Sequence, residues 1–211
     1  MITTTDLKDW ANDVFPIIND LNITVTNLNI LETEKSKGFT EIGNEFFNYF
    51  KHQQRFVLVI QLAKLFSNDN KNQRRNFKKL CNYLENESLD NSIIKLLNDK
   101  SNLRGYKDDV FRSREDILTA VSQIKEDFKN YKKTIKSIDT LRNKVYAHTD
   151  PERIFPEINN QQLFELVNFA NNIFNTLFGS IFVIEVDFKE TKKWDLRFVI
   201  EMFKKINNFN N

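Results

Sequence analysis

One short segment of the sequence combines a cation, an amide and a histidine. Residues 141–150 read Leu-Arg-Asn-Lys-Val-Tyr-Ala-His-Thr-Asp, and Pro151 follows them. His148 is one of only 2 histidines in the chain and lies six positions after Arg142. Histidine accepts and releases a proton near neutral pH, and the guanidinium fork of arginine suits a phosphate group. This pair of residues is therefore suited to acid–base chemistry on a phosphate.

The apolar pattern before this segment predicts the helix that carries it. From Val110 to Ile138, apolar residues recur at alternating intervals of three and four, with one turn skipped. Such a heptad seam predicts a long helix that packs lengthwise on a partner helix. Ser113 and Asp116 stand near its start with the spacing of a capping box.

If this helix continues through Leu141, its apolar stripe ends at a histidine. At about 100° per residue, His148 lies on the buried stripe, Arg142 lies about 80° to one side, and Asn143 lies nearer the outside. Pro151 limits the helix at the residue before it. Cations and histidines also stabilise the C-terminal end of a helix through its dipole. Simple helix capping is therefore the alternative interpretation of the same residues.

The rest of the chain is helical in pattern almost throughout, which predicts an all-α fold. Only 4 Gly and 3 Pro occur, so the residues that tight hairpin turns need are scarce. Pro16 should kink the first helix or mark its true start, and 181–187 has a short strand as its alternative. Besides the long helix, the predicted helices cover residues 6–37, 39–67, 74–86, 91–100, 161–186 and 194–206.

The charge balance restricts any contact with nucleic acid to a local surface. With 31 Lys and Arg against 29 Asp and Glu, the net charge is only +2, too small for a large positive field. Two local groups of cations stand out. The first group consists of Arg74, Arg75, Lys78 and Lys79. Its default interpretation is a solvated helix face, and an RNA-steering surface is the alternative. The second group consists of Lys129, Lys132, Lys133 and Lys136 and lies off the heptad seam.

Several classes of function lack their signatures. Cys81 is the single cysteine, which excludes an internal disulfide and a Cys-rich metal site; we expect it to be a small buried hydrophobe. His52 is expected to be half-buried and structural. No metal-ligand spacing, P-loop or glycine-rich nucleotide motif occurs, so no cofactor is expected. Without a secretory pattern or an apolar run long enough to span a bilayer, a cytoplasmic single domain covering residues 1–211 is expected.

The motif residues resemble a known family. Arg142, its polar follower Asn143 and His148 fill the three places of the R-x4–6-H motif of HEPN ribonucleases. The string Arg-Asn-Lys-x-x-Ala-His-Thr-Asp after a long helix is most similar to the abortive-infection type of HEPN protein from bacteria. A second stretch, residues 61–85, also looks like this group in its order of helix, Asn/Asp loop and helix.

The resemblance implies a HEPN-like helical bundle with long antiparallel helices and extra N- and C-terminal helices. It also implies a homodimer, with motif residues from two protomers facing across the interface. Active members are metal-independent endoribonucleases that leave a 2′,3′-cyclic phosphate. His148 would act as general base or acid, Arg142 would stabilise the transition-state charge, and Asn143 would hold the phosphate or orient the histidine.

The resemblance leaves partners and activity open. One HEPN toxin subgroup has a tyrosine two residues past the histidine, where its nucleotidyltransferase antitoxin modifies it; here Asp150 occupies that place. An antitoxin or another defence-system partner stays possible, while this particular pairing loses support. The leading function is an RNA-cleaving toxin or phage-defence effector. The alternatives are a non-catalytic HEPN scaffold that binds RNA or a partner protein, and a helical interaction protein in which Arg142 and His148 only cap a helix.

Overall fold

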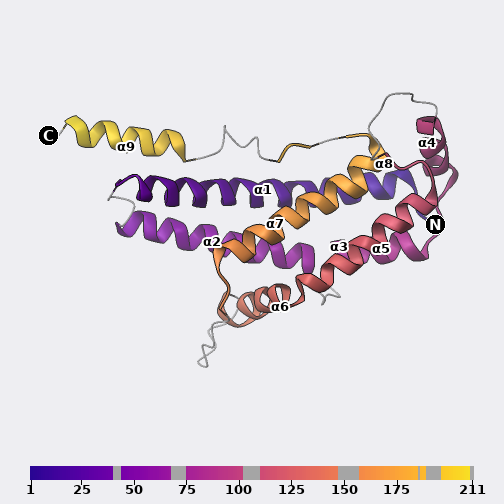
Figure 1. Ribbon diagram of the computed structural model, residues 1–211, viewed down its shortest axis with the longest axis horizontal. Coiled ribbons are helices and arrows are strands. Elements are labelled where there is room, and N and C mark those ends of the chain that lie inside the picture. Colours follow the sequence, from indigo (N-terminus) through magenta and orange to yellow (C-terminus); the bar gives the residue numbers. More distant parts are fainter. Residues whose placement is uncertain are drawn as a thin grey trace.

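The computed structural model describes residues 1–39, 44–67, 75–101, 110–146, 157–184, 186–188 and 196–209. Throughout these ranges the secondary structure is helical and no β-strand forms, which confirms the all-α prediction (Figure 1). The helices are α1 (Thr4–Ser36), α2 (Glu45–Phe66), α3 (Phe77–Asn86), α4 (Asn91–Ser101), α5 (Arg114–Asn130), α6 (Lys132–Thr140), α7 (Asn160–Phe174), α8 (Ser180–Phe182) and α9 (Arg197–Phe209), with π-helical turns η2 (Leu141–Tyr146) and η3 (Asn175–Gly179).

The two longest helices, α1 and α2, lie antiparallel along each other, and α7 crosses both (Figure 1). α1 begins with a capping box in which the Thr3 hydroxyl accepts from the Asp6 amide at 3.1 Å and the Asp6 carboxylate accepts from the Thr3 amide at 2.9 Å. The helix then passes through Pro16 without ending. Because proline has no backbone N–H, the carbonyl of Asn12 loses its hydrogen-bond donor within the helix. Asn12 and Pro16 are both exposed, so water can donate to that carbonyl instead. The prediction that Pro16 marks the true start of the helix is therefore wrong, and the kink stays a prediction.

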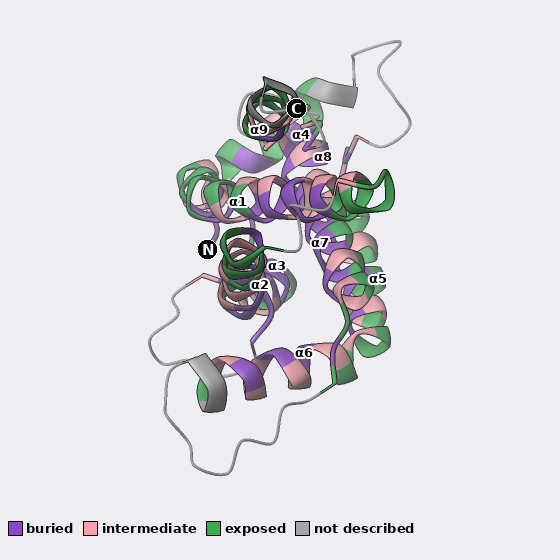
Figure 2. Cartoon of the chain, turned by 90° about the vertical axis from the view of Figure 1, so that its left-hand side faces the viewer, coloured by how far each residue is buried: buried purple, intermediate pink, exposed green. Residues whose placement is uncertain are grey.

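The heptad seam does not form one straight helix. α5 begins at the predicted capping box of Ser113 and Asp116 but ends at Tyr131, whose φ of −98° and ψ of 3° turn the chain. The Tyr131 ring stacks on Phe169 of α7, with ring centroids 4.7 Å apart. Beyond it, α6 packs across α2, whereas α5 packs along α3 (Figures 1 and 2). Ile135 and Ile138 after the turn are nevertheless buried, as are Ile124 and Phe128 before it.

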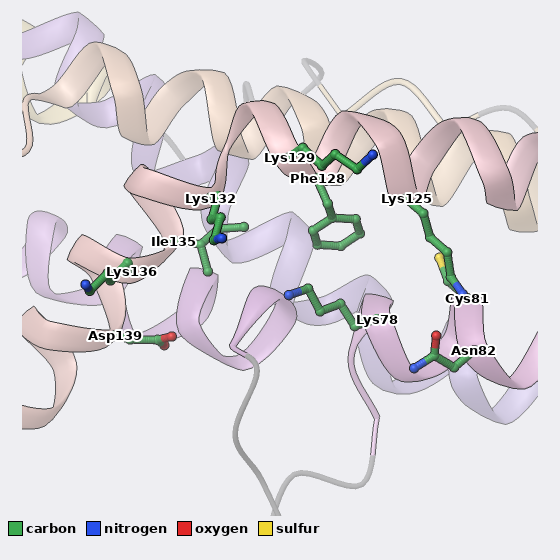
Figure 3. Close-up of a pocket in the computed structure, with 10 residues that line it drawn as sticks. All are labelled: Lys78, Cys81, Asn82, Lys125, Phe128, Lys129, Lys132, Ile135, Lys136 and Asp139. Carbon is green, nitrogen blue, oxygen red and sulfur yellow. The ribbon is translucent and has the colours of Figure 1, made fainter.

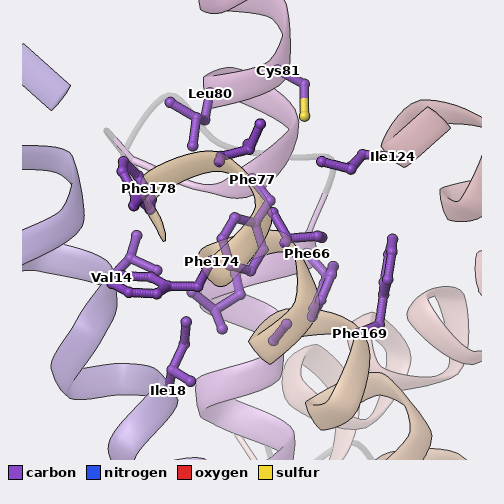
Figure 4. Close-up of a cluster of buried hydrophobic side chains, with 14 of the residues drawn as sticks. Val14, Ile18, Phe66, Phe77, Leu80, Cys81, Ile124, Phe169, Phe174 and Phe178 are labelled. Atoms are coloured by element: carbon purple, nitrogen blue, oxygen red, sulfur yellow. The ribbon is translucent and has the colours of Figure 1, made fainter. Parts of the chain in front are cut away.

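An aromatic cluster joins five helices at the centre of the bundle (Figure 4). Phe66, at the end of α2, is 1 % exposed and packs on Phe77, Phe128 and Phe169, with ring centroids 5.5 to 5.7 Å apart. α1 contributes Val14 to the same core. The end of α2 is therefore fixed by packing from α3, α5 and α7, and this matters because the candidate site begins at the next residue.

The end of α7 explains why the alternative for 181–187, a short strand, does not form. Val183 ends α8 in the left-handed region at φ 57°, and the Ile184 amide donates to the Gly179 carbonyl at 3.1 Å. The Asn175 side chain then accepts from the Val186 amide at 3.3 Å and donates to its carbonyl at 3.1 Å. The Ile184 amide and both backbone groups of Val186 therefore have the hydrogen-bond partners that a neighbouring strand would otherwise supply.

The C-terminal helix α9 forms a second, smaller core with the far ends of α1 and α2, where Leu31, Phe47 and Ile200 are buried together. The Asn27 side chain on α1 accepts from the Leu196 amide at 3.0 Å as the chain enters α9. Of the helices that the structure describes, none has the length and apolar character needed to cross a membrane.

Candidate functional site

Arg142 and Asn143 stand together in the π-helical turn η2, directly after α6. The Arg142 Nε donates to the Asn143 Oδ1 at 2.9 Å, and the Arg142 Nη1 donates to the Ser67 Oγ at 3.3 Å. Arg142 is half-buried, whereas Asn143 is exposed. The sequence placed Arg142 on the flank of the buried stripe and Asn143 nearer the outside, and the structure confirms both placements. His148, the third predicted site residue, lies outside the described residues.

Ser67 holds the arginine in place, and the three bonded residues Ser67, Asp139 and Arg142 are called the arginine hub below. Ser67 caps the C-terminal end of α2 and is 1 % exposed. Its hydroxyl donates a short hydrogen bond to Asp139 Oδ1 on α6 while it accepts from Arg142. The cation of Arg142 and the carboxylate of Asp139 are thus joined through one buried hydroxyl, in a charge-assisted chain.

Ser67 is also hydrogen-bonded to the start of a third helix, α3. Its carbonyl accepts from the Asn76 Nδ2 at 3.3 Å, and Asn76 is itself 1 % exposed. The Asn76 Oδ1 caps α3 by accepting from the Lys79 amide at 2.9 Å. The ends of α2, α3 and α6 therefore converge at Ser67, which holds the guanidinium from one side.

Sequence reasoning missed this support. Asp139 stands three residues before Arg142, which puts the two on one helical face and is a signal that could have been used. For Ser67 and Asn76 the sequence offers only polar residues at predicted helix ends. Nothing local in the sequence shows that Ser67 meets residues some seventy positions later.

The helix that carries the motif changes type at Leu141. Residues 141–146 form a π-helical turn, in which hydrogen bonds close one residue later than in an α-helix. The α-helical projection therefore agrees with the burial of Arg142 and Asn143 next to Leu141 but loses register farther along this turn. π-turns inside α-helices are frequently found at functional sites. Leu141 itself is buried, as the stripe predicted.

A groove adjoins the arginine hub. It has a volume of about 480 Å³, lies between α3 on one side and α5 and α6 on the other, and reaches Asp139 at one end (Figure 3). Cys81, Phe128 and Ile135 supply apolar lining. The rest of the lining is dominated by five lysines. Four of them come from the two predicted cation groups, namely Lys78, Lys129, Lys132 and Lys136, and the fifth is Lys125.

Cys81 is fully buried, and burial raises the pKa of its thiol to about 12. A thiol in this state is a poor nucleophile, so the prediction of a small buried hydrophobe is confirmed. In the described part of the chain, no three His, Cys, Asp or Glu side chains gather as metal ligands would.

His52 does not have the environment predicted for it. It is exposed, and it lines a small hollow of about 250 Å³ with Glu32, Arg55 and Asn160. The prediction that His52 is half-buried is therefore wrong, and its structural role stays a prediction. His52 precedes Ser67 by fifteen residues on one helix, which corresponds to about 22 Å along the axis. It therefore does not belong to the Arg142 cluster.

The all-α bundle of long antiparallel helices, with an Arg-Asn pair at the end of an inner helix, has the architecture of a HEPN-like protein. Comparison with known proteins agrees with this class, because the HEPN family model described as AbiU2 matches residues 5–195. The chain therefore belongs to the AbiU2 family of HEPN-type abortive infection proteins. No curated protein and no solved structure matches it.

Proposed function

We propose that this protein is a metal-independent endoribonuclease that acts in abortive infection, with Arg142, Asn143 and His148 as its catalytic residues. The observation that carries the proposal is the way Arg142 is held. A guanidinium has five N–H donors, and within the described residues the Ser67 and Asn143 bonds engage two of its nitrogens. The remaining donors suit the oxygens of a phosphate that gains negative charge during reaction.

The proposed reaction needs only groups of the RNA and the protein. His148 takes the proton of a ribose 2′-hydroxyl, and the 2′ oxygen forms a bond to the adjacent phosphorus. The bond from phosphorus to the 5′ oxygen breaks, and that oxygen leaves as a 5′-hydroxyl with the proton that the protonated His148 returns. The other product is a 2′,3′-cyclic phosphate. Arg142 stabilises the extra negative charge between these steps, and Asn143, exposed beside it, holds the phosphate or orients the histidine.

The test is cleavage of RNA by purified protein in the presence of EDTA, with analysis of the product ends. We expect cyclic-phosphate ends from the natural protein and their loss in Arg142→Ala and His148→Ala. Arg112→Ala is the control, because Arg112 is an exposed arginine that stands before α5, outside the cluster. Intact RNA with folded natural protein would favour the non-catalytic scaffold. Cleavage that survives both substitutions would refute the assignment of the motif.

The family resemblance further supports a homodimer in which each site takes residues from both protomers. Mixed dimers test this arrangement directly. When Arg142→Ala subunits are combined with His148→Ala subunits, a site shared between protomers regains one intact pair, so activity should return. A site contained within one protomer leaves every site defective, and the mixture would stay inactive. We place the activity in the cytoplasm, where its RNA occurs, with an antitoxin or another defence protein as a candidate regulator.

A further inference from the structure

The groove between α3 and the α5–α6 pair concentrates positive charge in a protein whose total charge is nearly balanced. Its lining contains five lysines and a single carboxylate, that of Asp139. The whole chain has a net charge of only +2. Since this concentration contrasts with the balance elsewhere, the groove is the local surface to which an anionic ligand would be attracted.

The lysines on its long side are spaced along one face. Lys125, Lys129, Lys132 and Lys136 follow one another at intervals of four, three and four residues, and all of them line the groove despite the turn at Tyr131. In helical rise this row extends over about 16 Å. A row of this length suits successive charges on an extended chain better than a single small anion.

The opposite side contributes Lys78, whose position is unusual for a lysine. It is half-buried on α3, and its Nζ lies 5.5 Å from the centre of the Phe128 ring (Figure 3). Burial is the main cause that lowers the pKa of its ammonium group, with the nearby Lys132 acting in the same direction. An anion in the groove would offset both effects.

The pairs that some of these lysines make within the protein are weak competitors. Lys125 contacts Glu85, and Lys129 contacts Glu126, but both pairs are at the surface. Exposed ion pairs of this kind contribute about 0 to 1 kcal/mol. A polyanion can therefore replace them at little cost.

The groove leads to the arginine hub. Asp139 closes one end of it and is hydrogen-bonded to Ser67, whose hydroxyl accepts from Arg142. A strand lying along the lysines would therefore reach Arg142 after the last of them. Regularly spaced phosphates match both the lysine row and the guanidinium fork, whereas an acidic peptide would match only the row.

We propose that this groove binds the phosphate backbone of the RNA strand next to the phosphate that is cleaved. The proposal rests on the ribonuclease function proposed above. In this arrangement Lys132 and Lys136 contact phosphates near the arginine hub, and Lys78 contacts the strand from the side of α3. Such contacts position the strand without reading its sequence.

Binding can be measured separately from cleavage. The probe is a fluorescein-labelled oligo(U) of about twelve nucleotides, followed by fluorescence anisotropy in the His148→Ala background. Each lost phosphate contact on a single strand should lower the slope of log affinity against log salt by about 0.7. Combining Lys78→Gln, Lys132→Gln and Lys136→Gln should therefore lower the slope by about 2. The control is Lys133→Gln, which removes an equal charge from an exposed neighbour outside the groove.

The outcomes separate the groove from the proposed function. An unchanged slope in Lys132→Gln and Lys136→Gln, relative to Lys133→Gln, would overturn the groove even if RNA is cleaved. A reduced slope in a protein that cleaves no RNA would support the groove and count against the nuclease. Equal binding of polyglutamate with the same lysine dependence would overturn RNA as the occupant. Melting curves of the single variants identify any loss of folding, and in the active protein KM should rise more than kcat falls.

Discussion

The serine at the end of α2 gives the sharpest test of how the site is built. Ser67→Ala removes one oxygen from a side chain that is 1 % exposed, while the aromatic packing before it stays intact. The variant deletes the hydrogen bond to Asp139 and the one from Arg142 together. It therefore probes the hub without touching a residue that contacts RNA in the proposed mechanism.

The magnitude follows from the groups that lose partners. A hydrogen bond to a charged group contributes about 1.5 to 3 kcal/mol, but Asp139 and Arg142 are only half-buried, so water replaces part of the loss. We expect the free energy of unfolding to fall by about 1 to 2 kcal/mol. For a chain of this size, that corresponds to a Tm lower by roughly 2 to 8 °C.

Activity should fall together with stability. Without the Ser67 hydroxyl, the guanidinium loses its contact to α2 and keeps only its bond to the neighbouring Asn143. If about half of the roughly 1 to 2 kcal/mol above is lost from the stabilisation of the transition state, kcat/KM falls by about two- to fivefold. Ser67→Ala should therefore be partly active where Arg142→Ala is inactive.

Urea unfolding followed by circular dichroism, together with the RNA cleavage assay, provides the two measurements. Ser137→Ala is the matched control, because Ser137 is a partly exposed serine on α6 outside the hub. The cycle of Ser67→Ala and Asp139→Asn should show coupling of about 1 kcal/mol. If Ser67→Ala unfolds like Ser137→Ala and the cycle shows no coupling, the hub does not hold Arg142 as described.

Three further changes test the fold around the site. Phe66→Ala removes the ring shared by α3, α5 and α7, so urea unfolding should show a loss of about 3 to 5 kcal/mol; a loss below about 1 kcal/mol would contradict the packing described. Cys81 should react with a thiol reagent near neutral pH only after unfolding, since burial raises its pKa to about 12; fast labelling of folded protein would be inconsistent with this burial. The Asp116 carboxylate accepts hydrogen bonds from the backbone amides of Arg112 and Ser113, and these bonds, that of Arg112 most of all, lower its pKa in the folded state. Its stabilising effect is therefore present above the unfolded pKa of about 3.9 and is lost as the pH falls through the lower folded value. Asp116→Asn should lower Tm near neutral pH by an amount equivalent to at most about 1 kcal/mol, and the difference should vanish in acid; a difference that persists there would mean that the charge is not the cause.

The helices were predictable where the signal is local. The capping box of Ser113 and Asp116 marks the start of α5, and the apolar periodicity identifies α1, α2 and α7, because both depend on neighbours within one or two turns. The turn at Tyr131 was not predictable, since the apolar residues continue in register through it. Its cause is tertiary: the ring stacks on α7 while α6 crosses to α2.

The candidate site divides in the same way. The degrees of burial of Arg142 and Asn143 were predictable from the apolar stripe of the helix, because both residues stand within two positions of Leu141, the last residue of the stripe that the structure confirms as buried. The supporting Ser67, Asn76 and Asp139 come from three helices, and only packing brings them together. The two lysine groups were likewise visible as separate helix faces, but the groove they share exists only once α3 lies against α5. The role of His148 stays a prediction.

The π-helical turn couples the length of the motif to the shape of the helix end. Each hydrogen bond in η2 spans one residue more than a hydrogen bond in the α-helix α6 before it. The turn therefore contains one residue more than an α-helical turn in the same place would. Deleting one residue after Asn143 would let this turn close as an α-helix, and the spacing from Arg142 to His148 would fall from six to five. A motif of variable spacing can therefore be accommodated by exchanging one type of turn for the other. A deletion at this point tests tolerance of the motif to length, separately from its chemistry.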